Sequence, residues 1–241
     1  MSNGRIILDE SLLLAEGSER KCYLHPSLPG HCIKVPVKAG LGKKCPQCRV
    51  DLYNARRLKA RRVPMLHTVD CLGWIDTNLG PALLTERVMD EDGSASMSLQ
   101  ESLESGNLKW EDVDRMLKDL WVWAYRYSVV VSELNIKNLM HRAGSGGGRL
   151  VVVDGLGGRK PDLVFYLRQH LPWLARKKTM KRWSREYGKV KSAVLKLVQK
   201  SHDMDENFKD DFLGFDSGVS EHDQLGSVNI SSGQSYPKRH E

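Results

Sequence analysis

Three polar side chains near the middle of the chain are spaced so that two of them could bind a cation, with a further carboxylate on the same loop. Glu133 and Asn138 stand five residues apart on one polar loop, and Asp154 follows a short apolar run. Two apolar runs, at 139–142 and 150–153, flank a glycine- and serine-rich turn, and this pattern predicts a β-hairpin. The open end of the hairpin would bring Asn138 and Asp154 together, and amide and carboxylate oxygens suit Mg²⁺. The alternative is a surface hairpin with ordinary turn carboxylates.

A lysine set among apolar residues is the second candidate group. Lys34 lies in a β-rich run, and shorter apolar runs before it predict two further strands around a turn that contains Gly17 and Ser18. A lysine on such a strand can reach phosphates as a point charge. The helix predicted at 49–62 carries Asp51, the only acid between Cys48 and Val69. That this acid pairs with the lysine is what the resemblance to protein kinases, given next, implies. The alternatives are a lysine that snorkels to solvent and a solvated aspartate in a first helical turn.

The loop and hairpin resemble the catalytic loop and the metal-binding aspartate of protein kinases, H-R-D-x-x-x-x-N followed by D-F-G. In this resemblance Glu133 falls on the catalytic Asp, Asn138 on the Asn and Asp154 on the metal-binding Asp. The two residues before Glu133 are Val and Ser instead of His and Arg, and a glycine follows Asp154 where kinases have Phe. These departures leave open whether the site still catalyses.

The kinase resemblance also implies a nucleotide site. The glycine turn would cover the phosphates, the strand lysine would bind them, and the backbone after the fifth strand would meet the adenine at a hinge. The residues implied for the nucleotide are Gly17, Ser18, Lys34, Asp51, Glu86 and Val88. The cofactors implied are ATP and Mg²⁺.

Several stretches of the chain also resemble the YrbL family, bacterial kinase-like proteins named for membership in the PhoP regulatory network. The stretches are Gly-Ser-Glu-Arg-Lys-Cys-Tyr-Leu-His-Pro at 17–26, Cys-Ile-Lys-Val at 32–35, Asn-Leu at 138–139 and Asp-Gly-Leu-Gly at 154–157. The resemblance covers roughly residues 12 to 190. It implies a kinase-like fold, and the activity that it implies is phosphotransfer.

The predicted fold is α+β: a protein-kinase-like two-lobed fold with a small β-rich N-lobe and a truncated helical C-lobe. We place the kinase-like domain at 1–200, with the N-lobe at about 5–89 and the C-lobe at about 96–200. The segment 201–241 contains nine acids, three basic residues and few apolar ones, so we expect a disordered acidic tail.

The helical C-lobe is expected to be interrupted near its end. Apolar residues at three- and four-residue steps predict a helix that begins near 107 and ends by 131. A helix opened by Pro161 should end near 170, where Pro172 would break it, and one or two basic helices should follow from 177 to about 200. Gly188 should weaken the middle of this last segment.

Charge and cysteine content narrow the classes of function. The formal net charge is +7, and residues 159–200 contain 13 Lys or Arg against two acids, so the basic charge is concentrated.

No apolar run approaches the length of a membrane helix and no signal peptide is evident, so we expect a cytoplasmic protein with reduced thiols. Cys45 and Cys48 form half of a zinc site or are two thiols packed at a helix start.

Three functions remain open from the sequence. The first is an ATP- and Mg²⁺-dependent phosphotransferase in which Glu133 orients or deprotonates the hydroxyl of an unknown acceptor. An anionic acceptor would suit the basic segment. The second is a pseudokinase that acts as a regulatory or nucleotide-binding module. The third is a protein that binds nucleic acid or another anionic surface through 159–200.

Overall fold

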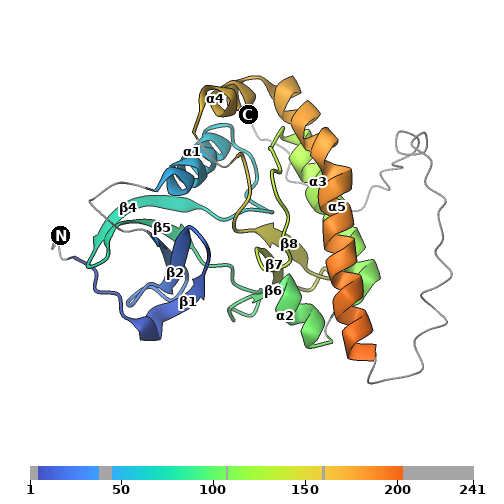
Figure 1. The fold of residues 1–241 in the computed structure, drawn as a ribbon, viewed down its shortest axis with the longest axis horizontal. Coiled ribbons are helices and arrows are strands. Elements are labelled where there is room, and N and C mark those ends of the chain that lie inside the picture. The colour runs from blue at the N-terminus through green and yellow to red at the C-terminus, as the bar shows by residue number, and fades with distance from the viewer. Residues whose placement is uncertain (1–4, 38–44, 107, 159–160, 203–241) are drawn as a thin grey trace. The chain divides into compact units, whose positions relative to one another are not determined.

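Five antiparallel strands form the sheet of the N-terminal part, in the order β1-β2-β3-β5-β4 (Figure 1). The computed structural model of the chain describes residues 5–37, 45–106, 108–158 and 161–202. The strands are β1 Leu13–Glu16, β2 Arg20–Leu24, β3 His31–Pro36, β4 Cys71–Thr77 and β5 Gly80–Glu86. One face of the sheet is covered by a cluster that contains Leu8, Tyr23, Ile33, Val35 and Ala82. The predicted strands of this region are therefore present, with Lys34 on the central strand of the sheet.

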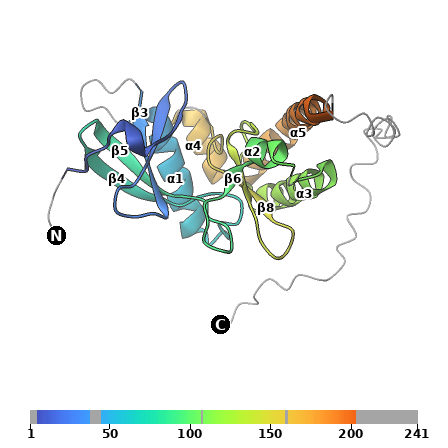
Figure 2. The same ribbon diagram turned by 90° about the horizontal axis from the view of Figure 1, so that it is seen from below.

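Helix α1, Pro46–Ala60, lies against the other face of this sheet (Figures 1 and 2). It starts three residues earlier than the predicted helix because Pro46 occupies the first turn, where proline has no hydrogen bond to lose. Its buried residues Cys48, Leu52 and Ala55 pack in one cluster with Cys71 and Leu83 of the sheet. This packing turns Asp51, one helical turn away from Cys48 and Ala55, toward β3.

The C-terminal part combines a small sheet with four helices. The strands are β6 Met97–Ser98, β7 Leu139–Arg142 and β8 Arg149–Val152, and the helices are α2 Leu99–Glu104, α3 Trp110–Arg126, α4 Leu163–His170 and α5 Pro172–His202. The fully buried residues Val113, Leu117 and Leu120 of α3 pack with Leu139 of β7 and Val194 of α5. This cluster fixes the hairpin of β7 and β8 against the long helices.

The end of the chain departs from the sequence prediction. Helix α5 is continuous over 31 residues, so Pro172 begins the helix and Gly188 does not interrupt it. Proline is tolerated in a first helical turn. Val190 and Val194, just after the glycine, are buried against the core, and this packing outweighs the weak helix propensity of glycine. No described helix is long and apolar enough to cross a membrane.

The predicted α+β class, with a sheet-rich N-terminal part and a helical C-terminal part, is confirmed. The boundaries of the two lobes remain a prediction. The predicted acidic tail lies outside the described residues, apart from its first two positions, which belong to α5.

Candidate functional site

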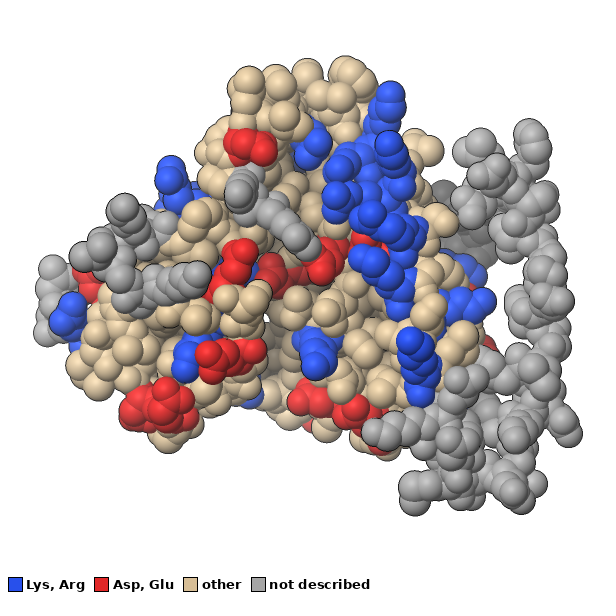
Figure 3. All heavy atoms as spheres, in the orientation of Figure 1, with Lys and Arg blue, Asp and Glu red and all other residues tan. Residues whose placement is uncertain are grey.

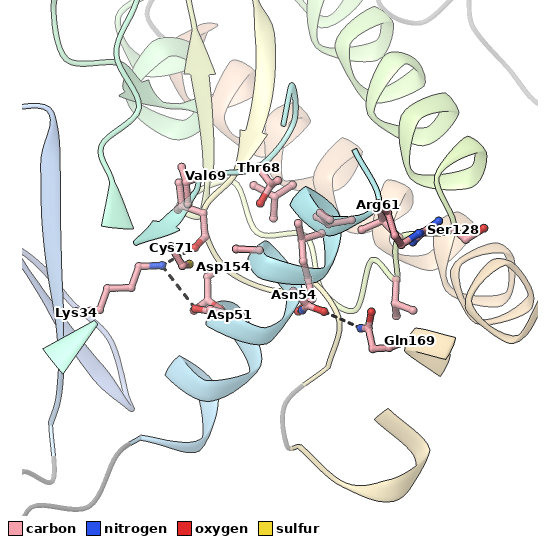
Figure 4. Close-up of a pocket in the computed structure, with 17 residues that line it drawn as sticks. Lys34, Asp51, Asn54, Arg61, Thr68, Val69, Cys71, Ser128, Asp154 and Gln169 are labelled. Atoms are coloured by element: carbon pink, nitrogen blue, oxygen red, sulfur yellow. Dashed lines mark hydrogen bonds and ion pairs between the residues drawn. The ribbon is translucent and has the colours of Figure 1, made fainter. Parts of the chain in front are cut away.

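Four charged side chains from four parts of the chain meet near the end of β8. Lys34 Nζ lies 3.7 Å from Asp51 Oδ2, so the pair predicted from the sequence is present. Arg20 bridges the two acids: its Nη1 lies 2.5 Å from Asp51 Oδ2, and its Nη2 lies 2.6 Å from Asp154 Oδ2. Figure 4 shows Lys34 reaching from the sheet toward Asp51 and Asp154. The side chain of Asp154 is 36% exposed, whereas those of Arg20 and Asp51 are under 10% exposed.

The strand period explains why Lys34 joins this cluster. Ile33 and Val35 are buried in the apolar cluster on one face, and alternation along a strand puts Lys34 on the opposite face, under α1. Lys34 Nζ also donates to the carbonyl oxygen of Val153, at 2.8 Å. The lysine therefore connects the N-terminal sheet with the backbone that carries Asp154.

The hairpin brings Asn138 and Asp154 to one place, as the sequence predicts. Leu139 of β7 pairs with Val152 of β8, and the amide of Val153 donates to the carbonyl oxygen of Asn138 at 3.1 Å. Both Asn138 and Asp154 are half-buried at this open end of the hairpin. An amide oxygen and a carboxylate are thus available on adjacent backbone segments.

The loop that carries Glu133 packs against the residue after Asp154. The amides of Ser132 and Glu133 donate to the carbonyl oxygen of Gly155, at 2.9 and 3.3 Å. Gly155 has a φ of +100°, and a Cβ added there would lie 2.4 Å from the carbonyl oxygen of Glu133. This close approach explains why a glycine stands where kinases have Phe, because a side chain would push the two segments apart.

The pKa values of Arg20 and Asp154 are both shifted toward the charged form. Burial alone would raise the pKa of Asp154, but Arg20 and then Lys34 hold it below its ordinary value. Burial works against the charge of Arg20 as well, but Asp51 and Asp154 raise its pKa above the ordinary value. A buried cation therefore stands between the two acids, in a position where a metal ion or a phosphate could otherwise approach Asp154.

Comparison of sequences identifies the family. The family described as PhoP regulatory network protein YrbL matches residues 6–191 of this chain. The chain belongs to the YrbL family. Its relatives include the proteins named YrbL of Escherichia coli strain K12 and Shigella flexneri, each 29% identical over 188 residues that cover 75% of this chain and 85% of the relative. The resemblance seen in the sequence is thereby confirmed.

Among solved structures, the chain is similar to the PknI kinase domain of Mycobacterium tuberculosis. The superposition with the crystal structure of that domain has a TM-score of 0.37 and a sequence identity of 16%. It covers 59% of this chain and 57% of the PknI chain. A single-site variant of the domain shares 15% with the same TM-score. This YrbL-family chain spans little more than half of the kinase domain it matches, and no statement about activity follows from this overlap.

Four residues predicted to contact the nucleotide do not line the cavity beside the ion cluster. Gly17 closes the turn between β1 and β2 by donating its amide to the carbonyl oxygen of Arg20, and Ser18 is exposed in that turn. Glu86 accepts a hydrogen bond from the amide of Asp70 at 3.1 Å, and the carbonyl oxygen of Val88 accepts one from the amide of Ser96. The cavity of about 30 Å³ beside Lys34, Asp51 and Asp154 is lined by none of the four. Their nucleotide contacts therefore remain predictions.

Two residues at this site were missed by the sequence analysis. Arg20 is not among the predicted site residues, although the alternation along β2 places it on the same face as Cys22. Glu186 is fully buried on α5 and accepts a hydrogen bond from the amide of Leu134, next to Glu133, at 3.2 Å. A signal for Glu186 did exist, since it is one of only two acids in the basic segment 159–200.

Cys45 and Cys48 are buried free thiols at the start of α1. A hydrogen bond from Cys48, and to a smaller extent the charge of Arg20, lowers the pKa of Cys45 to about 6. Within the described ranges, no group of three or more His, Cys, Asp or Glu side chains could hold a metal ion. Both thiols pack in one cluster with Leu52, Ala55, Cys71 and Leu83.

Proposed function

We propose that this YrbL-family chain binds Mg-ATP beside Asp154 and transfers a phosphoryl group to a hydroxyl of an acceptor. The observation that carries the proposal is the Lys34–Asp51 pair, held next to Asp154 by the contact of Lys34 with Val153. Phosphoryl transfer depends mainly on positioning and on neutralising charge, and a lysine fixed by an acid near a metal-binding carboxylate serves both needs.

The residues present fit Mg²⁺ and ATP in their chemistry. Asn138 and Asp154 offer the oxygen atoms that Mg²⁺ prefers, and Lys34 would hold phosphate oxygens. Mg-ATP, when bound, supplies the phosphoryl group and neutralises its charge. Because Arg20 already engages Asp154 Oδ2, a metal ion at Asp154 must share or displace this guanidinium.

Glu133 is the residue that would act on the acceptor. The transfer forms a bond between the acceptor oxygen and the γ-phosphorus, breaks the bond to the bridging oxygen of ADP, and passes the hydroxyl proton to the carboxylate of Glu133. A carboxylate one methylene longer than Asp serves here because the loop backbone is held by Gly155 and Glu186. Its role is to orient and deprotonate the hydroxyl.

Arg20 favours a second candidate function, a pseudokinase that serves as a regulatory or nucleotide-binding module. Its guanidinium satisfies both Asp51 and Asp154 without a metal ion. A site balanced in this way could keep the fold and bind nucleotide without magnesium-dependent chemistry.

Titration of ATP with and without Mg²⁺, followed by calorimetry and by turnover assays, tests both candidates. The phosphotransferase proposal expects tighter binding with Mg²⁺, and Asp154→Ala should abolish the magnesium-dependent part. Asp76→Ala, which removes an exposed aspartate of β4, is the matched control and should behave as wild type. ATP binding that ignores Mg²⁺, without turnover, would favour the pseudokinase, and absence of ATP binding would refute the phosphotransferase and the nucleotide-binding form of the pseudokinase.

A further inference from the structure

A cavity of about 360 Å³ lies beside Glu133, between its loop and helices α4 and α5. Its lining is strongly basic. The cations that line it are Arg168, Lys178, Arg182, Arg185 and Lys189. The acids that line it are Glu133 and Glu186. Figure 3 shows Lys and Arg side chains gathered along the face that α5 presents, next to a group of acidic side chains.

The acids of the lining do not balance these cations. Glu186 is fully buried and is shared by Arg185 and Lys189, at 2.8 and 3.2 Å. Arg182 uses Nη1 to donate to the carbonyl oxygen of Ser132, at 2.6 Å, which holds its guanidinium beside the Glu133 loop. Among the described residues, no carboxylate lies within ion-pair distance of Arg168 or Lys178.

The cations of the cavity repel one another. Burial lowers the pKa of Lys178 first, and the charges of Arg182 and Arg168 lower it further. Partly buried cations that face one another cost free energy unless an anion joins them. The half-buried side chains of Arg168, Lys178 and Arg182 therefore form a place where a bound anion would relieve repulsion.

We propose that this basic cavity binds a phosphate group of the acceptor, so that the substrate is a small phosphorylated molecule with a free hydroxyl. The inference rests on the proposed function, since it assigns the cavity to the acceptor because Glu133 lines it. The cavity volume of about 360 Å³ lies in the range of small-molecule pockets. A cavity of this size fits a compact phosphate monoester better than it fits a flat membrane surface. Arginine and lysine are the side chains that bind phosphate by charge-assisted hydrogen bonds.

Calorimetric titration with glycerol 3-phosphate and with inorganic phosphate, at low salt and without ATP, tests the binding. Lys178→Ala should weaken the affinity for both probes at least about tenfold, since a hydrogen bond to a charged group is lost. Lys177→Ala is the matched control: it removes the same charge one residue away, from an exposed side chain that does not line the cavity, and should change the affinity less than about twofold. Lys178→Ala should not lower the melting temperature, because it removes a repelled charge.

Three results would overturn the inference. The first is absence of binding to both probes at millimolar concentration, and the second is equal weakening by Lys178→Ala and Lys177→Ala. The third is binding of single-stranded RNA or of vesicles with anionic lipid while glycerol 3-phosphate is ignored, since that would assign the cations to a macromolecule.

A further titration separates this inference from the proposed function. Glycerol 3-phosphate should bind with unchanged affinity when a non-hydrolysable ATP analogue and Mg²⁺ are saturating, because the two phosphate sites are distinct. Competition between the two ligands would contradict a separate acceptor site. If the analogue does not bind at all while glycerol 3-phosphate does, the phosphate cavity stands and its role as an acceptor site falls with the proposed phosphotransfer.

Discussion

Replacing Arg20 by methionine tests the ion cluster directly. Arg20→Met keeps an unbranched apolar stem of similar reach and removes the guanidinium that bridges Asp51 and Asp154. Lys34, at 3.7 Å from Asp51, then remains as a cation beside the two acids. We expect the variant to be less stable than wild type and to respond more strongly to Mg²⁺.

The magnitude follows from the burial of the partners. Removing one partner of a buried ion pair costs roughly 3–5 kcal/mol. Asp154 is 36% exposed, so solvent screens part of its charge, and Lys34 still compensates Asp51. We therefore expect a loss of about 2–3 kcal/mol, which lowers the melting temperature of a domain of this size by about 4–12 °C.

Thermal unfolding across pH and Mg²⁺ concentration is the assay. Lys21→Met is the control: the partners of this neighbouring residue, Glu10 and Glu16, are exposed, so the substitution should leave the stability nearly unchanged. Because the pKa of Asp154 is depressed below 3.8, its contribution is present above that pH and is lost as the pH falls through the folded-state pKa. The difference between wild type and Arg20→Met should therefore shrink in acid.

Added Mg²⁺ completes this experiment. Mg²⁺ should raise the melting temperature of Arg20→Met more than that of wild type, because the metal ion no longer competes with the guanidinium for Asp154. Equal stability of Arg20→Met and Lys21→Met at pH 7 would refute the cluster as a stabilising unit. A variant that is destabilised but indifferent to Mg²⁺ would show that Asp154 does not bind the metal.

Three further predictions concern the loop and the core. Glu133→Gln should lower turnover by about 10² to 10⁴ while ATP affinity stays nearly unchanged, and Glu133→Asp should retain activity, as measured by steady-state kinetics. Gly155→Ala should cost at least about 1 kcal/mol in urea unfolding because its Cβ would meet the carbonyl oxygen of Glu133, whereas Gly146→Ala, which meets open space, should not. Burial lowers the pKa of His67 below 6.5 in the folded state. As the pH falls from about 7 to about 5, the unfolded state therefore takes up a proton before the folded state does, and the free energy of unfolding should decrease. His67→Gln should flatten that slope.

The parts of the site that the sequence predicted depend on local patterns. The hairpin that joins Asn138 and Asp154 was predicted from two short strands around a glycine-rich turn, and in the structure Leu139 pairs with Val152. Lys34 and Asp51 were paired because a strand lysine and the single acid of the next helix were the only local choice. These predictions needed no knowledge of contacts between distant segments beyond the kinase resemblance.

The parts that the sequence did not predict depend on packing over long range. Arg20 is a charged residue that follows a turn, and such residues are usually exposed. It is buried between two acids because β2 lies beneath α1. Gly188 has poor helix propensity, yet α5 continues past it because Val190 and Val194 are buried in the cluster that also contains the apolar residues of α3. In each case tertiary contacts outweighed a local preference.

The ion networks of Arg20 and of Glu186 have opposite effects on the candidate site. Arg20 fixes Asp154 to the N-terminal sheet, so it restrains the residue that would bind Mg²⁺. Glu186 holds the amide of Leu134 with the same carboxylate that pairs with Arg185 and Lys189 in the basic cavity. An anion bound in the cavity would interact with Arg185 and Lys189 and weaken their ion pairs with Glu186. The carboxylate of Glu186 would then accept a stronger hydrogen bond from the amide of Leu134. Occupation of the cavity would therefore tighten the backbone next to Glu133, and a substrate that brings its own phosphate would position the loop that acts on its hydroxyl.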